Sequence, residues 1–176
     1  METTETLKLI LKDNKVILKD KSHIQSLAEK GYGHKKDGKI ELFSWETIHL
    51  VAENWLEIYD DGMKRKIEMD ELIKSFSSKD KRIWSKYLVY RDLRNRGYVV
   101  KQGAGWNVDF RVYERGQYGK EAAKILISSL QEGEETGITN FIKILNSAGS
   151  LKKNVIIAVI ERRGEVVYYS LSKFAL

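Results

Sequence analysis

The chain has 176 residues, with 31 Lys and Arg against 25 Asp and Glu, three His, and neither Cys nor Pro. This length suits one sizeable domain or two small ones, and the lack of Cys excludes a disulfide framework and a thiolate metal site. The formal net charge of +6 favours a polyanionic partner, nucleic acid ahead of acidic lipid, but charge alone fits a basic protein without such a partner equally well. No apolar run reaches the length of a membrane span and the first residues lack the order of a signal peptide, so we expect a cytoplasmic protein.

The first 78 residues alternate between strand-like and helix-like patterns. Leu and Ile alternate with Lys around Asp13-Asn14, which is typical of a β-hairpin with one face in water. Apolar residues recur at helical spacing after Ser44, a favoured N-cap residue. In chain order we expect a hairpin at 7–18, a helix at 20–30 with Asp20 or Ser22 as N-cap, a strand at 39–43, a helix at 44–55, a hairpin at 56–67 around Asp60-Asp61-Gly62, and a helix at 70–76.

The polar segment Ser77-Ser78-Lys79-Asp80 marks a domain boundary, because it is short and precedes a long helix. That helix is predicted from Ile83, Tyr87 and Tyr90, which recur at spacings of four and three, with Gly97 as its stop. After it we expect strands at 98–101 and 108–113 separated by the turn Gly103-Ala104-Gly105, a strand within 123–130, a helix around 138–145, and strands at 155–160 and 165–171 joined by a turn at 162–164.

The predicted fold class is an α+β N-terminal domain over residues 1–78, followed by an α/β C-terminal domain over residues 79–176 with a small mixed sheet. The run Ile125-Leu126-Ile127 is too continuous for a strand with one face in water, so we place it at the centre of that sheet.

Few residues suggest a cofactor or a metal. Gly103-Ala104-Gly105 resembles part of a dinucleotide-binding fingerprint, but the third glycine is missing and no βαβ unit follows, so we interpret it as a turn. His23, His34 and His49 have no metal-ligand spacing, and we interpret them as surface or packing residues. We therefore expect no cofactor and no metal.

Cleavage of RNA without a metal needs three groups. A base activates the ribose 2′-OH, an acid protonates the leaving 5′-oxygen, and a cation stabilises the charge on phosphorus. The C-terminal half offers Tyr113 and the pair Lys152-Lys153 for two of these roles, and it contains no His.

Three blocks of this half resemble, in the same order, the catalytic domain of the archaeal tRNA-splicing endonucleases: YLVYRDLRNRGYVVKQG, DFRVYERG and SLKKNVIIAVIERRGEVVYY. The resemblance covers residues 84–171 and implies a restriction-endonuclease-like fold. It also implies metal-independent cutting of intron–exon junctions in precursor tRNA, which leaves 2′,3′-cyclic phosphate and 5′-hydroxyl ends. The family's catalytic Tyr matches Tyr113 and its Lys matches Lys153, whereas Ala122 stands where the family has its His.

The exchange at Ala122 removes the general acid, because Ala has no titratable proton. General acid–base catalysis is typically worth about 10²–10⁴-fold, so we expect Tyr113 and Lys153 to be vestigial and the chain to be close to inert alone. A longer segment, Ser147-Ala148-Gly149-Ser150, also precedes Lys153 and is a second departure that could displace it. Since the family includes heterotetramers, the resemblance implies a structural subunit whose partners are a catalytic tRNA-splicing endonuclease subunit and precursor tRNA.

Other contacts follow from the same resemblance. Lys143 lies near a family arginine that grips the substrate, and Arg115 and Lys152 are weaker RNA-binding candidates. Lys143 could equally be a solvated lysine on the polar face of a helix, and Lys153 a solvated lysine at the end of a strand. Tyr113 could serve in packing or RNA contact rather than in catalysis.

Two parts of the C-terminal hairpin match the family's assembly surfaces. The turn from Glu161 to Glu165 matches an acidic loop that inserts into another subunit, but its two arginines dilute the charge and favour the acceptor role. The strand that carries Val166 and Tyr168 would otherwise leave a bare sheet edge, so we expect it at an interface, although it also suits the domain's own core.

Two other functions stay open at this point. The chain could be an active endonuclease that takes a histidine such as His34 or His49 from its other domain or from another copy. It could also be an RNA-binding module derived from the nuclease fold, with no enzyme partner.

Overall fold

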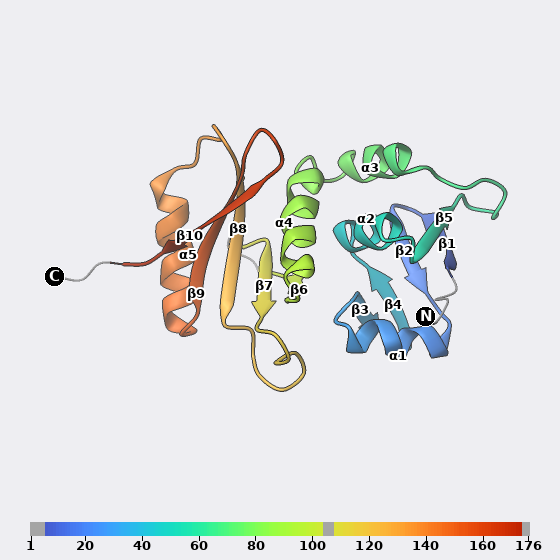
Figure 1. Ribbon diagram of the computed structural model, residues 1–176, viewed down its shortest axis with the longest axis horizontal. Coiled ribbons are helices and arrows are strands. Elements are labelled where there is room, and N and C mark those ends of the chain that lie inside the picture. The colour runs from blue at the N-terminus through green and yellow to red at the C-terminus, as the bar shows by residue number, and fades with distance from the viewer. Residues whose placement is uncertain (1–5, 104–107, 174–176) are drawn as a thin grey trace. The chain divides into compact units, whose positions relative to one another are not determined.

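The computed structural model describes residues 6–103 and 108–173 (Figure 1). The chain divides into two compact units, residues 1–87 and 88–176. The division falls inside helix α4 (Ile83–Asn95), whereas the sequence places the domain boundary ahead of that helix. No helix among the described residues is long and apolar enough to cross a membrane.

The first unit is a five-stranded sheet with helices, in the strand order β3-β4-β2-β1-β5. Its one parallel pair among the described strands is β1 with β5, so the sheet is mixed. The elements are β1 (Leu7–Lys12), β2 (Lys15–Leu18), α1 (Lys21–Glu29), β3 (His34–Lys36), β4 (Lys39–Leu42), α2 (Ser44–Ala52), β5 (Leu56–Tyr59) and α3 (Met69–Ser77).

The predicted hairpin at 7–18 is confirmed. Leu11 of β1 faces Val16 of β2, and Asp13 and Asn14 between them have φ of 51° and 59°. A two-residue turn with both residues in the left-handed region matches the twist of the strands that it joins.

The helix caps follow from nearby polar groups. Asp20 is the N-cap of α1, as predicted, and its carboxylate accepts a hydrogen bond from the Ser22 N–H at 2.9 Å. The N-cap of α2 is Phe43 rather than Ser44, because the Glu46 carboxylate reaches back to accept the Phe43 N–H at 3.0 Å. The prediction of a helix at 44–55 is wrong for its last three residues, because α2 ends at Ala52.

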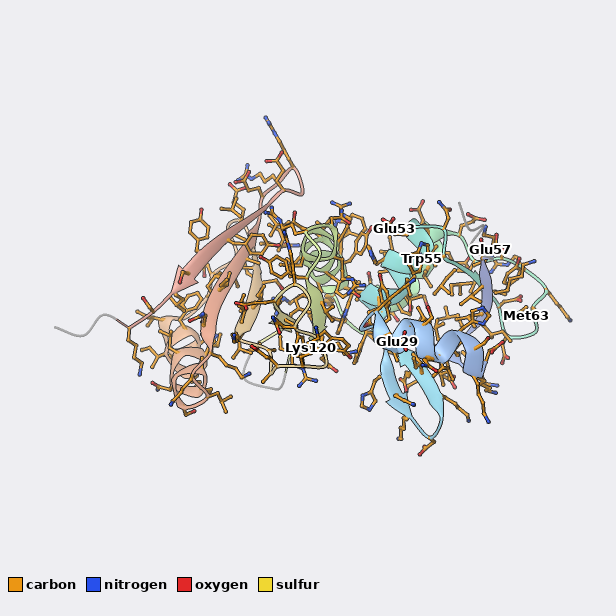
Figure 2. All side chains as sticks on the ribbon, turned by 60° about the horizontal axis from the view of Figure 1, so that its bottom comes forward. Glu29, Glu53, Trp55, Glu57, Met63 and Lys120 are labelled. Carbon is orange, nitrogen blue, oxygen red and sulfur yellow. The ribbon has the colours of Figure 1, made fainter. Side chains whose placement is uncertain are left out.

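The predicted hairpin at 56–67 is wrong in its second strand. β5 forms, but it pairs in parallel with β1, and residues 63–67 contribute one isolated bridge between Tyr59 and Lys66. The turn is held by the Asp60 carboxylate, which accepts the backbone N–H groups of Lys64 and Arg65 at 2.9 and 3.1 Å. Met63 projects from it with 45% of its surface exposed (Figure 2).

The second unit is also a mixed five-stranded sheet, in the order β10-β9-β8-β7-β6, so the predicted central position of residues 125–127 is confirmed. β8 and β9 run parallel, and the other pairs run antiparallel. After α4 its elements are β6 (Val99–Gln102), β7 (Phe110–Tyr113), β8 (Ile125–Gln131), α5 (Ile138–Ser150), β9 (Asn154–Ile160) and β10 (Val166–Leu171).

A helix covers each face of this sheet (Figure 1). On the α4 face, the ring of Tyr90 lies 6.3 Å from that of the fully buried Phe110. The α5 face is closed by the apolar cluster of Leu126, Ile144, Ala148, Val155 and Ile157.

Gly103 ends β6 where the chain approaches β7 closely. A Cβ there would lie 2.0 Å from the Val108 carbonyl oxygen, so the position requires glycine. The rest of the predicted turn, Ala104 and Gly105, lies outside the described residues.

Candidate functional site

The register of the second sheet brings two candidate residues, Tyr113 and Lys153, to one end of it. Val112 of β7 faces Ile125 of β8, which faces Asn154 of β9. Tyr113 lies one residue beyond this row on β7, and Lys124 and Lys153 immediately precede it on the neighbouring strands. Strands lie about 4.8 Å apart, so roughly 10 Å separates the backbones of β7 and β9 here.

Lys153 is tied to the strand beside it. Its ammonium donates a hydrogen bond to the carbonyl oxygen of Ala123, and the Asn154 N–H donates to the Lys124 carbonyl at 2.9 Å. Ala123 is buried, while Ala122 before it is exposed. Ala122 therefore presents a solvent-facing methyl group one residue before the carbonyl that accepts from Lys153.

Tyr113 alternates with Val112, which is fully buried, so it points to the opposite face of β7 together with Arg111. It is half-buried, and the ring of Tyr118 meets it edge-on with centroids 5.0 Å apart. Packing against Tyr118 holds the phenol at the end of the sheet.

Lys124 lies between these two positions, and its positive charge is balanced by two carboxylates. Its ammonium is 2.8 Å from the Glu121 carboxylate and 3.7 Å from that of Glu114. The hydrogen bond to Glu121, followed by the two negative charges, raises the pKa of Lys124 and keeps it cationic.

The segment from Ser147 to Ser150, predicted as a longer stretch that departs from the family pattern before Lys153, forms the last turn of α5. Lys152 follows it with φ of 51°, and the N–H groups of Lys152 and Lys153 donate to the carbonyls of Gly149 and Ala148 at 3.1 and 3.0 Å. This is a Schellman cap, with Lys152 at the position that glycine usually occupies.

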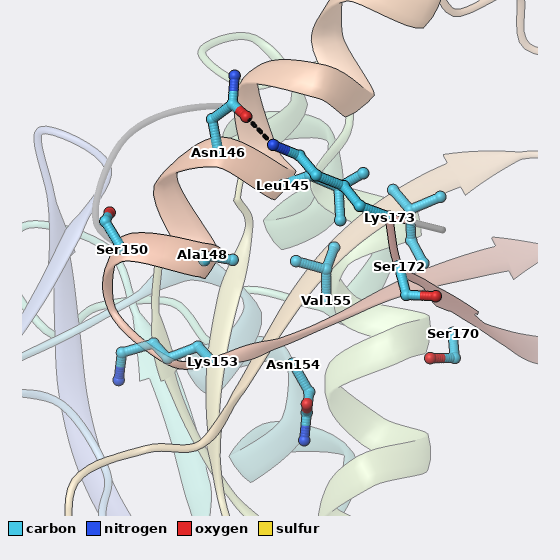
Figure 3. A pocket seen from close by; sticks show the side chains of 12 residues that line it. Leu145, Asn146, Ala148, Ser150, Lys153, Asn154, Val155, Ser170, Ser172 and Lys173 are labelled. Carbon is cyan, nitrogen blue, oxygen red and sulfur yellow. Dashed lines mark hydrogen bonds between the residues drawn. The ribbon is translucent and has the colours of Figure 1, made fainter. Parts of the chain in front are cut away.

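A hollow of about 430 Å³ lies between the end of α5, the start of β9 and the end of β10 (Figure 3). Lys153 borders it, and the Lys173 ammonium donates to the Asn146 side-chain oxygen across it. Within the described chain, neither Tyr113 nor Ala122 lines this hollow.

The three predicted RNA-binding residues are exposed but are not gathered into one cluster. Lys143 lies on α5, Lys152 at its end, and Arg115 in the connection after β7, where its guanidinium lies 5.4 Å from the Tyr98 ring centroid. Sequence reasoning missed Lys101 and Arg111, which face each other across β6 and β7. Their alternation with the buried Val100 and Val112 was the available signal.

Of the predicted interface residues, two are exposed to solvent and two are partly buried within their own domain. Glu161 and Glu165 are exposed and close the turn before β10, with the Glu161 N–H donating to the Glu165 carbonyl at 2.9 Å. Val166, the first residue of β10, is partly buried.

Tyr168 faces α4 within its own domain. Its hydroxyl donates to the Asp92 carboxylate at 2.7 Å, and the Arg96 guanidinium also lies 2.7 Å from that carboxylate. Burial raises the pKa of the Tyr168 phenol, and the hydrogen bond to Asp92 raises it further.

All three histidines belong to the first unit. His23 lies on α1 beside Ser22, the exposed His34 lies on β3, and the buried His49 lies on α2 with its ring 6.4 Å from that of Tyr32. Across the described residues, no group of three His, Asp or Glu side chains could hold a metal ion.

Comparison with known proteins accounts for both units. Residues 7–73 match the family model described as the tRNA intron endonuclease N-terminal domain, and residues 83–168 match that of the tRNA intron endonuclease catalytic C-terminal domain. The chain belongs to the tRNA intron endonuclease family. The tRNA-splicing endonuclease of Methanococcus vannielii is 36% identical over 175 residues, which cover 98% of this chain and 97% of the relative. That of Methanococcus maripaludis is 33% identical with the same coverage, and that of Pyrococcus abyssi is 32% identical over 87% of each chain.

Membership in the tRNA intron endonuclease family confirms the resemblance and the fold class that the sequence predicts, an N-terminal α+β domain and a C-terminal α/β domain with a mixed sheet. The part that matches the catalytic domain contains β6 to β9 and the site positions Tyr113, Ala122 and Lys153.

Proposed function

We propose that this chain is a structural subunit of a cytoplasmic tRNA-splicing endonuclease complex, in which a catalytic subunit cuts precursor tRNA to 2′,3′-cyclic phosphate and 5′-hydroxyl ends. The observation that carries this proposal is Ala122. Tyr113 and Lys153 lie at the same end of the sheet, and Ala122, which the family resemblance aligns with the catalytic His, offers a methyl group and no proton for the leaving oxygen.

The charge of the second unit supports a role in binding precursor tRNA. Residues 88–176 contain 14 Lys and Arg against 9 Asp and Glu, so they carry nearly all of the excess of positive charge. Phosphate contacts dominate the affinity for RNA, and folded RNA is recognised mainly by its shape. In this role Lys143, Lys152 and Arg115 contact phosphates, and Tyr113 and Lys153 bind the RNA without cutting it.

An open sheet edge supports a protein partner. Among the described strands, β10 pairs with β9 alone, and its Tyr169 is 56% exposed. On α5, Ile138 and Ile142 are 73% and 47% exposed. Unpaired sheet edges and exposed apolar side chains are both features that another subunit can cover. Glu161, Glu165 and Val166 border this edge, which we assign to the catalytic subunit in a hetero-oligomer.

The test is cleavage of a precursor-like RNA that carries a bulge–helix–bulge. The purified chain alone should leave this RNA intact, and addition of a histidine-bearing homologous chain should start cleavage. Efficient cutting by this chain alone would reject the structural role. In that event, replacement of His34 or His49 by Ala shows whether one of them supplies the proton.

A further inference from the structure

Lys101 of β6 and Arg111 of β7 form a like-charge pair across two antiparallel strands. Directly opposite residues of such strands have their Cβ atoms about 5 Å apart, and like charges at this spacing destabilise the sheet. Each residue alternates with a fully buried valine, Val100 and Val112, so both side chains point to the same outer face.

No carboxylate balances Arg111. It is exposed, and the described part of the chain offers it no ion-pair partner. Nearby Glu114 and Glu121 are both engaged with Lys124. The fold therefore keeps an uncompensated positive charge opposite a second one.

Aromatic rings border the pair. The Lys101 ammonium lies 5.9 Å from the centroid of the Tyr118 ring, and Tyr118 meets Tyr113 edge-on at 5.0 Å. Tyr113 is two residues beyond Arg111 on the same face of β7, so the two cations and the two rings form one continuous surface. We call these four residues the β6–β7 surface.

We propose that the β6–β7 surface is a phosphate-binding site for precursor tRNA, in which Lys101 and Arg111 grip the backbone and Tyr118 offers a ring on which an unstacked base can lie. This rests on the proposed function, because it names the residues that hold the substrate of the same complex. A bound phosphate offsets the repulsion between the two cations, and aromatic stacking with basic side chains is typical of proteins that bind RNA bulges and single strands. An acidic protein partner would use the cations but has no need of the two half-buried tyrosine rings beside them.

The experiment measures RNA affinity at several salt concentrations. The wild-type chain, alone and with its catalytic partner, is titrated against a fluorescent bulge–helix–bulge RNA between 50 and 200 mM salt. It is compared with Lys101→Gln, Arg111→Gln and the double variant. The control is Lys35→Gln combined with Lys36→Gln, which removes the same charge from exposed residues of β3.

If the proposal is correct, the double variant lowers the slope of log affinity against log salt by about two, because two phosphate contacts are lost. Across this salt range the wild type should then lose about tenfold more affinity than the double variant. The control should keep the wild-type slope, and the unfolding temperature of the double variant should stay the same or rise, because the repulsion is gone.

Two results would overturn the proposal. An unchanged affinity and slope in the double variant would show that RNA does not contact this surface. Retained RNA binding with lost assembly would assign the surface to the protein partner instead. Failure of the wild-type complex to bind the RNA at all is a different result, and it would reject the proposed function itself.

Discussion

The Lys153 ammonium donates a hydrogen bond to the Ala123 carbonyl, across the start of two parallel strands. This contact holds the lysine one residue away from Ala122. Lys153, Tyr113 and Ala122 thus lie at one end of one sheet, and under the proposed function a proton donor could be added at position 122.

Ala122→His should restore part of the chemistry. Ala122 is exposed and precedes β8, so an imidazole can be added there without disturbing the core. We expect single-turnover cleavage of a bulge–helix–bulge RNA to rise by on the order of 10²–10⁴-fold. Ala122→Gln, which is similar in size and has no titratable proton, is the control. Equal rates for the wild type, the His variant and the Gln variant would contradict the assignment of this position.

Lys152→Gly should stabilise the protein. Lys152 has φ of 51° at the end of α5, where a side chain costs about 1–2 kcal/mol and glycine has no such cost. Part of this gain is offset by the entropy of glycine in the unfolded chain, so we expect a net rise of about 0.5–1 kcal/mol in the free energy of unfolding. Urea denaturation measures it.

Lys152→Ala is the matched control, because it removes the charge and keeps the backbone strain. It should not stabilise the protein. If both variants weaken RNA binding equally, the ammonium of Lys152 contacts phosphate. If neither does, Lys152 has no part in RNA binding.

Tyr168→Phe should destabilise the second unit by about 1–2 kcal/mol near neutral pH, because it removes a half-buried hydrogen bond to a charged group. Burial and Asp92 raise the pKa of Tyr168 in the folded state. The stabilisation is therefore complete below the pKa of the unfolded tyrosine, about 10, and declines as the pH rises above it.

Unfolding free energies of both proteins between pH 8 and 11 check this. The gap between wild type and Tyr168→Phe should narrow above pH 10. If the difference stays constant or widens above pH 10, the pKa of Tyr168 is not higher in the folded chain than in the unfolded chain, and the prediction is wrong.

Ile142→Lys should prevent assembly and leave the fold intact. Ile142 is 47% exposed on α5, so a polar side chain there changes the stability of the isolated chain by less than about 0.5 kcal/mol. A lysine buried in an apolar interface should weaken association with the catalytic subunit more than tenfold. Sedimentation of the mixture measures this. Gln25→Lys adds the same charge at an exposed position of α1 and should assemble normally.

Much of the second unit could be predicted because its patterns are strong and local. Ile83, Tyr87 and Tyr90 define α4, and the apolar run at 125–127 lies in the central strand. The end of the sheet that unites Tyr113 and Lys153 was recognisable through the family resemblance. Periodicity alone could not show it, because the register between β7, β8 and β9 is set by contacts far apart in sequence.

The features that the sequence did not predict have physical explanations. β3 was not predicted, because His34, Lys35 and Lys36 are all exposed and show no apolar alternation, so pairing with β4 alone defines it. The second strand of the 56–67 hairpin is reduced to one bridge between Tyr59 and Lys66. The parallel pairing of β5 with β1, nearly 50 residues away, could not be predicted because no turn signal marks a contact between distant segments. Lys101 and Arg111 were passed over because their opposition appears only once the strands are in register.

The exposed position of Ala122 has a consequence for how such a chain can arise. A residue outside the strands with its side chain in water can change between His and Ala at little cost in folding free energy. Under the proposed function, a duplicated gene can therefore lose the proton donor by a change of this one codon while its product still folds. Selection for a stable protein would not oppose that loss, so one ancestor can give rise to both a cutting copy and a silent one.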